Sequence, residues 1–136
     1  MRILGLDIGE KRIGLAISDE LGITAQGLET LNRTKLADDL SRLTTLMREK
    51  EIDKLVVGLP KNMNGTLGPQ AERVKLFVEL LIKELPCEVD YWDERLTTIA
   101  ARRTLIEADV SRKKRKKSVD RLAAVLILQG YLDKIK

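Results

Sequence analysis

The chain opens with two apolar runs on either side of a Gly9-Glu10 turn. Residues 3–8 are apolar on both faces except at one position, and residues 13–18 alternate large apolar with small side chains. This pattern predicts two strands joined as a β-hairpin. The exception is Asp7, although a strand buried on both faces normally carries an uninterrupted apolar run. Asp7 therefore either caps the turn, where Asp is common, or points into a site that uses its charge.

The later elements follow from periodicity and from Gly and Pro positions. We expect a third strand within 24–30, a helix over 34–50 capped by Thr34, a strand over 55–59, a helix from Pro69 to about 85 capped by Gly68, and a strand over 87–92. A short helix is expected over about 97–107, and a last helix from Ser118. The order βββαβαβαα predicts one α/β domain over 1–136, with a mixed five-stranded sheet covered by helices on both faces.

Composition removes several kinds of chemistry. Hydrophobic and charged contents of 43% and 34% are those of a globular protein. With no histidine and the single Cys87, the chain lacks His-based catalysis, His-containing zinc sites and an intramolecular disulfide. Remaining candidates are carboxylates, Lys, Ser, Thr, or a hard metal ion such as Mg²⁺ or Mn²⁺. No stretch suits a signal peptide or a bilayer span, so we expect a cytoplasmic protein without a membrane partner.

The positive charge is concentrated near the C-terminus. The net charge is +4, but residues 111–136 carry nine Lys and Arg against two Asp and Glu, a net +7, whereas residues 1–110 carry −3. Such asymmetry indicates a polyanionic partner. The densest part lies in an expected flexible loop at about 109–117 and consists of Arg112, Lys113, Lys114, Arg115, Lys116 and Lys117. These residues suit both a solvated loop and a contact to phosphates.

Carboxylates interrupt apolar patterns at two further places. Asp120 shares a helical face with Ala124 and Ile127, although an Asp in a first helical turn is also favoured by the helix dipole. The Asp93-Glu94 pair closes a strand and is equally compatible with a solvated pair beside Arg95.

In an α/β sheet, sites gather beyond the carboxyl ends of parallel strands, so these carboxylates are expected at one edge. At about 4 Å and an effective dielectric near 20, each ionised pair would cost about 4 kcal/mol, which divalent cations would remove. Two ions about 3.5–4 Å apart suit phosphodiester cleavage. The residues together therefore favour metal-assisted hydrolysis of nucleic acid.

Four segments in order, at residues 5–16, 57–66, 93–98 and 117–124, resemble the YqgF family. That family has a ribonuclease H-like fold similar to the RuvC resolvases. It is described both as Holliday junction resolvases and as nucleases that mature the 5′ end of the 16S ribosomal RNA precursor. The resemblance therefore implies a metal-dependent endonuclease.

The resemblance assigns catalysis and metal binding to Asp7, Glu94 and Asp120. Strand parity places Asp93 and Glu94 on opposite faces, so the sequence leaves open which of them turns inward, although the family pattern favours Glu94.

Further residues could contact the nucleic acid. Besides the basic run, the candidates are Lys11, Arg12, Asn62, Asn64 and Arg95. Each also has a local interpretation, as a hairpin surface charge, a turn residue or a group that orients a neighbouring carboxylate. Aromatic residues make up only 3% of the chain, which favours recognition of backbone or shape over base stacking.

Two other functions fit parts of the sequence. The first hairpin also suits a phosphate-binding hairpin of actin-like ATPases and sugar kinases, although those proteins pair two such domains. A non-catalytic nucleic-acid-binding module would share the basic run. The sequence leaves open structured RNA versus branched DNA as the substrate, and a monomer versus a homodimer.

Overall fold

The computed structural model describes residues 1–60, 64–93 and 112–135, with 112–121 described as backbone. The elements in these ranges are β1 (Ile3–Ile8), β2 (Arg12–Ser18), β3 (Ala25–Gly27), β4 (Leu31–Asn32), α1 (Leu36–Glu49), β5 (Lys54–Leu59), α2 (Pro69–Glu84), β6 (Glu88–Asp93) and α4 (Arg112–Ile135). The short helix expected over 97–107 lies outside the described residues. No helix within the described ranges combines the length and the apolar character needed to cross a membrane.

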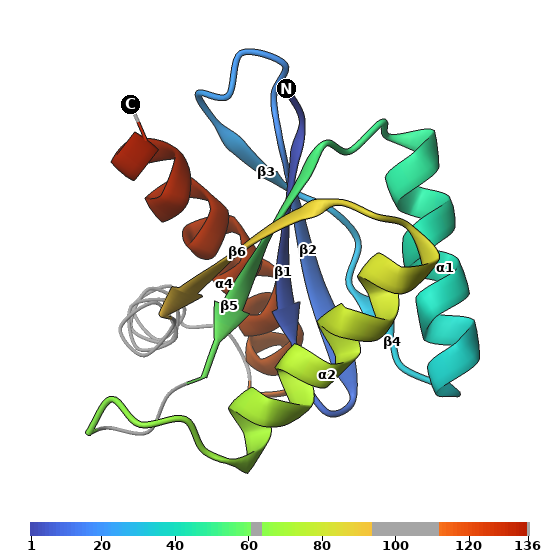
Figure 1. Ribbon diagram of the computed structural model, residues 1–136. Coiled ribbons are helices and arrows are strands. Elements are labelled where there is room, and N and C mark those ends of the chain that lie inside the picture. The colour runs from blue at the N-terminus through green and yellow to red at the C-terminus, as the bar shows by residue number, and fades with distance from the viewer. Residues whose placement is uncertain (61–63, 94–111, 136) are drawn as a thin grey trace.

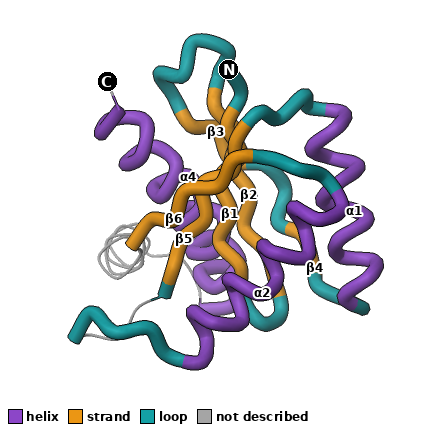
Figure 2. The backbone as a smooth tube through the Cα atoms, in the orientation of Figure 1, coloured by secondary structure: helices purple, strands orange, loops and turns teal. Residues whose placement is uncertain are grey.

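The strands form one mixed sheet in the order β3-β2-β1-β5-β6, and β4 also pairs with β2. β1 pairs antiparallel with β2 and parallel with β5, and β5 pairs parallel with β6. Figure 1 shows α1 and α2 on one face of this sheet and α4 on the other. Figure 2 shows the β1–β2 turn and the β2–β3 loop at opposite ends of the sheet. The predicted mixed sheet with helices on both faces is therefore confirmed.

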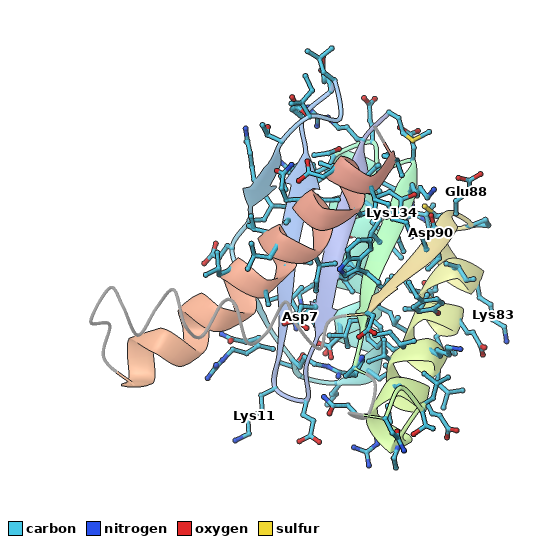
Figure 3. All side chains as sticks on the ribbon, turned by 90° about the vertical axis from the view of Figure 1, so that its left-hand side faces the viewer. Asp7, Lys11, Lys83, Glu88, Asp90 and Lys134 are labelled. Atoms are coloured by element: carbon cyan, nitrogen blue, oxygen red, sulfur yellow. The ribbon has the colours of Figure 1, made fainter. Side chains whose placement is uncertain are left out.

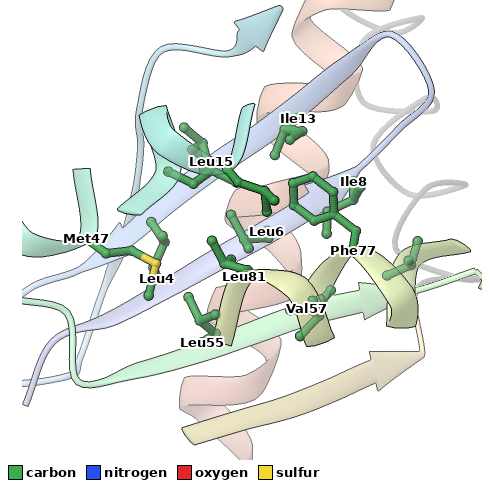
Figure 4. Close-up of a cluster of buried hydrophobic side chains, with 14 of the residues drawn as sticks. Leu4, Leu6, Ile8, Ile13, Leu15, Met47, Leu55, Val57, Phe77 and Leu81 are labelled. Atoms are coloured by element: carbon green, nitrogen blue, oxygen red, sulfur yellow. The ribbon is translucent and has the colours of Figure 1, made fainter. Parts of the chain in front are cut away.

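Strand alternation divides the core into two layers. Leu4, Leu6 and Ile8 of β1 pack with Phe77 and Leu81 of α2 in the larger cluster (Figure 4). The smaller cluster lies under α4 and contains Ile3, Ala16, Val56, Ala124, Ile127, Leu128, Tyr131 and Leu132. Alternation thus turns the odd-numbered residues of β1, including Asp7, toward α4.

α4 lies close to β1 because Gly5 has no side chain. A Cβ on Gly5 would stand 2.9 Å from Leu128 Cβ and 3.3 Å from the carbonyl oxygen of Ala124. Figure 3 shows α4 running obliquely across this face, from the end of the sheet that holds Asp7 to the end near Lys134. Helix and central strand are therefore in direct contact along the face that carries Asp7.

The basic run is helical. α4 begins at Arg112, whereas the sequence predicted a loop to Lys117 and a helix from Ser118. The prediction was wrong for residues 112–117 because Lys and Arg are good helix formers and the run contains neither Gly nor Pro. Residues 109–111 lie outside the described ranges.

Two helix starts test the predicted caps. α2 begins at Pro69 with Gly68 as its N-cap, as predicted. α1 begins at Leu36 with Lys35 as its N-cap and without a side-chain cap, so the prediction of Thr34 was wrong. The backbone N–H of Thr34 instead donates to Asp39 Oδ1 at 2.9 Å. A carboxylate inside the helix therefore supplies the hydrogen-bond acceptor for the residue before it.

Candidate active site

Asp7 is a half-buried carboxylate near the C-terminal end of the central strand, on the α4 face. Its antiparallel register partner on β2 is Gly14. On β5 the register pairs Leu6 with Val57, so the next residue, Gly58, follows beside Asp7. Neither neighbouring strand therefore carries a side chain beyond hydrogen at this level of the sheet.

The turn after Asp7 is tight and is closed by backbone groups. Gly9 N–H donates to the carbonyl of Arg12 at 2.8 Å, and a Cβ on Gly9 would stand 2.9 Å from that oxygen. Glycine is therefore required here by close backbone approach. Lys11 is exposed at the tip of the turn, and Figure 3 shows it at the same end of the sheet as Asp7. Arg12 is half-buried at the start of β2.

The register of β6 places Asp93 on the face opposite Asp7. Asp93 pairs with Leu59, whose side chain packs in the α1 and α2 cluster. The preceding residue, Trp92, lies on the α4 face, where it packs against the cluster that holds Tyr131. Asp93 and Asp7 therefore do not share a face of the sheet. Glu94 and Arg95 lie outside the described residues.

Helical position 120 lies toward the Asp7 end of the sheet. The backbone of Ala124 lies beside Gly5, because a Cβ on Gly5 would stand 3.3 Å from the Ala124 carbonyl oxygen. Position 120 precedes Ala124 by four residues, about 6 Å along α4, and Asp7 follows Gly5 by two residues, about 7 Å along β1. Both steps lead toward the end of the sheet that holds Asp7. Because α4 begins at Arg112, position 120 lies in its third turn. The helix dipole acts mainly on the first turn, so it does not account for an Asp here.

Asn64 has a structural role in the loop before α2. Its Oδ1 accepts hydrogen bonds from the backbone N–H of Thr66 at 3.1 Å and from the Thr66 hydroxyl at 2.6 Å. Gly65 between them has φ of 86°, which suits glycine. The turn interpretation of Asn64 is thus confirmed, and Asn62 lies outside the described residues. Within the described side chains, no three acidic or thiol groups gather into a possible metal site; that set excludes Glu94 and Asp120.

A model of the RuvX family, described as Holliday junction resolvase, matches residues 1–134. The chain belongs to the RuvX family. RuvX and YqgF are two names of one family, so this match confirms the resemblance that the four sequence segments indicated. A relative from Clostridioides difficile is 58% identical over 132 residues, covering 97% of this chain and 94% of the relative. Another from Clostridium tetani is 58% identical over 135 residues, covering 99% and 98%. Both carry the name "Putative pre-16S rRNA nuclease".

Solved structures similar to this RuvX-family chain include two junction complexes. Thermus thermophilus RuvC with a Holliday junction substrate has a TM-score of 0.59 at 15% identity, covering 99% of this chain and 96% of that one. Fowlpox virus resolvase with Holliday junction DNA has a TM-score of 0.57 at 14% identity, covering 99% of each chain. At these identities the likeness concerns the fold, and it confirms the predicted ribonuclease H-like architecture.

A buried ion pair that the sequence analysis missed lies behind the turn of this RuvX-family protein. Asp39 in α1 is 0% exposed and accepts hydrogen bonds from Arg42 Nη2 at 2.8 Å and Arg33 Nε at 3.3 Å, besides Thr34 N–H. Burial opposes ionisation of Asp39, but these donors outweigh it and hold the pKa of its carboxyl below the ordinary value. A signal was available, because Asp39 falls on the stripe of Leu36 and Leu43, where an apolar residue is expected.

An apolar groove of about 370 Å³ lies on the α1 and α2 side of the β1–β2 turn. Its lining includes Ile8, Arg33, Phe77 and the exposed Leu76. Asp7 is directed to the other face of the sheet, so this groove is separate from the candidate active site.

Proposed function

We propose that this RuvX-family protein is a metal-dependent nuclease that hydrolyses nucleic-acid phosphodiesters, and that it processes the 5′ end of pre-16S ribosomal RNA. The observation that carries the proposal is the position of Asp7, a carboxylate at the end of the central strand, flanked by Gly14 and by Gly58. The names of relatives 58% identical over nearly the whole chain support the RNA substrate.

The proposed ligands are Asp7, Glu94 and Asp120, which would hold Mg²⁺ or Mn²⁺. The donor chemistry fits, because carboxylates are the ligands these hard ions prefer. The location of Asp93 on the opposite face favours Glu94 from the acidic pair, and the step along α4 favours Asp120. When bound, a pair of such ions supplies charge stabilisation for phosphodiester hydrolysis.

The remaining residues of the proposed site bind the phosphate backbone. Lys11 extends from the turn beside Asp7, and Arg12 follows it. The basic run begins α4 at the same end of the sheet, so its six cationic residues, Arg112 to Lys117, would lie near the scissile region. Asn62, Asn64 and Arg95 are further proposed contacts, and the side-chain oxygen of Asn64 also accepts hydrogen bonds in its own turn.

Holliday junction resolution is the second candidate function. It is favoured by the description of the family and by the resolvases among the similar structures. A resolvase that makes paired symmetric cuts needs two active sites, which a homodimer would supply. Sedimentation at the assay concentration would therefore accompany the substrate comparison.

A cleavage assay tests the proposal. Purified protein would be incubated with Mn²⁺ or Mg²⁺ and three labelled substrates: precursor RNA with the 16S 5′ end, unstructured RNA of equal length, and four-way junction DNA. We expect cleavage of precursor RNA that Asp7→Asn abolishes while binding persists. Asp93→Asn is the matched control, because it removes one carboxylate charge on the opposite face and should retain cleavage.

Three outcomes would contradict the proposal. Full activity of Asp7→Asn would refute the site. Cleavage of the junction alone would replace the RNA substrate with the resolvase alternative. Binding without cleavage under either metal would replace the nuclease with a non-catalytic nucleic-acid-binding module.

A further inference from the structure

The side chain of Arg33 joins three parts of the molecule behind the β1–β2 turn. Its Nη1 donates to the carbonyl oxygen of Gly9 at 2.9 Å, and its Nε donates to Asp39 Oδ2 at 3.3 Å. The guanidinium carbon stands 5.0 Å from the centroid of the Phe77 ring in α2. The guanidinium therefore links the turn, α1 and α2.

This arrangement depends on the shape of a guanidinium. Its donors point in fixed, different directions, and its flat face stacks on aromatic rings, so one group satisfies Gly9, Asp39 and Phe77 together. A lysine ammonium is a compact charge that does not reproduce this fork. The Arg33 side chain is only 23% exposed, and the Asp39 side chain is 1% exposed, so solvent screens their interaction weakly.

Arg42 binds the same Asp39 carboxylate as Arg33, whereas the bond to the Gly9 carbonyl comes from Arg33. Its Nη2 donates to Asp39 Oδ1 at 2.8 Å and also to the carbonyl of Asn32 at 2.8 Å. Its side chain is 43% exposed. Of the two arginines on Asp39, Arg33 is the one that donates to the backbone of the turn.

We propose that Arg33 is a positioning residue for Asp7. Gly9 is two residues beyond Asp7, so anchoring its carbonyl on the α1 and α2 side fixes the end of β1 and hence the direction of the Asp7 carboxylate on the other face. Asp39 orients the guanidinium, and Phe77 covers it. The role in metal binding rests on the proposed function, whereas the role in holding the turn does not.

Two measurements on the full-length protein test this role, using Arg33→Met, Arg33→Lys and the matched control Arg42→Met. Hydrogen exchange would follow the Gly9 amide, which is bonded to Arg12 in the turn. Electron paramagnetic resonance of Mn²⁺ would measure the metal dissociation constant without substrate. Thermal melting would confirm that each variant is folded at the assay temperature, and Arg33→Lys preserves the charge if Arg33→Met is too unstable.

We expect both Arg33 variants to speed exchange at Gly9 about tenfold, which corresponds to removal of one hydrogen bond to a charged group. The Mn²⁺ dissociation constant should rise about tenfold, at the low end of the effect of groups that orient metal ligands. Arg42→Met should leave both quantities near the wild-type values even though it also removes a partner of Asp39.

Unchanged Gly9 exchange in the Arg33 variants, or equal effects of Arg42→Met, would overturn the positioning role. Faster Gly9 exchange with an unchanged Mn²⁺ constant would overturn the link from the turn to Asp7. If the wild-type protein binds no Mn²⁺, the proposed metal site fails, and the exchange data still decide whether Arg33 holds the turn.

Discussion

Replacing Asp39 with alanine should destabilise the protein far more than the same change at its neighbour Asp38. Both residues lie in the first turn of α1, so both changes remove the same favourable charge from the positive end of the helix. Asp38 is exposed, whereas Asp39 is 0% exposed and accepts bonds from Thr34, Arg33 and Arg42. The difference between the two variants therefore isolates the buried interactions.

The magnitude follows from what is left behind. Removing one partner of a buried ion pair costs about 3–5 kcal/mol because the other charge loses its compensation. Here the Arg42 side chain is 43% exposed and can be hydrated, so the low end, about 3 kcal/mol, applies. At about 2.1 cal/mol/K of unfolding entropy per residue, a chain of 136 residues loses about 10 °C in Tm. Asp38→Ala should cost less than about 1 kcal/mol.

The pH dependence gives an independent check. The pKa of Asp39 is below its ordinary value of 3.8 in the folded protein, so its contribution is fully present above pH 3.8. That contribution is lost as the pH falls through the lowered value, because the unfolded chain binds the proton more readily than the folded protein does. Urea unfolding at pH 7 and at several values below 3.8 should show the gap between wild type and Asp39→Ala narrowing. A destabilisation no larger than that of Asp38→Ala, or a gap independent of pH, would refute the reasoning.

Two further predictions follow from glycine packing and from the basic run. Gly5→Ala should lower the free energy of unfolding by about 1–3 kcal/mol in urea titrations, because its Cβ would meet Leu128 Cβ at 2.9 Å. An unchanged transition midpoint would show that α4 shifts without cost. Replacing Lys113, Lys114 and Lys116 with alanine should flatten the dependence of log affinity on log salt by about 0.7–0.9 for each phosphate that is no longer bound. The matched control makes the same charge change at exposed Lys35, Arg48 and Lys83, on the α1 and α2 side, and should keep the wild-type slope.

Local signals predicted the elements whose causes are themselves local. The Gly68-Pro69 start of α2 and the hairpin around Gly9 were predicted because the backbone demands lie in those residues. The start of α1 was missed because a carboxylate four residues into the helix, Asp39, supplies the acceptor for Thr34. β4 was missed because it has only two residues, which are defined as a strand by their pairing with β2.

The candidate site divides in the same way. The interruption of an apolar strand marked Asp7 from the sequence, and alternation then assigns it a face. The sequence left Asp93 and Glu94 open, because strand alternation puts neighbouring residues on opposite faces without showing which face each one takes. The pairing of Asp93 with Leu59 places Asp93 on the face opposite Asp7.

Asp7 and Asp39 look alike in the sequence, since each replaces an apolar residue in a buried pattern. Their surroundings differ. Asp39 is enclosed by a backbone N–H and two guanidinium groups, which keep its carboxylate ionised. Its position in a buried pattern is therefore explained by its contribution to the stability of the fold. Asp7 stands between two glycine positions at the edge where sites form in such sheets. Arg33 connects them, because one end of its guanidinium binds Asp39 and the other binds the turn that follows Asp7. The Asp39 carboxylate thus orients Arg33, and Arg33 in turn positions Asp7. A substitution at Asp39 should therefore also change the position of the Asp7 carboxylate.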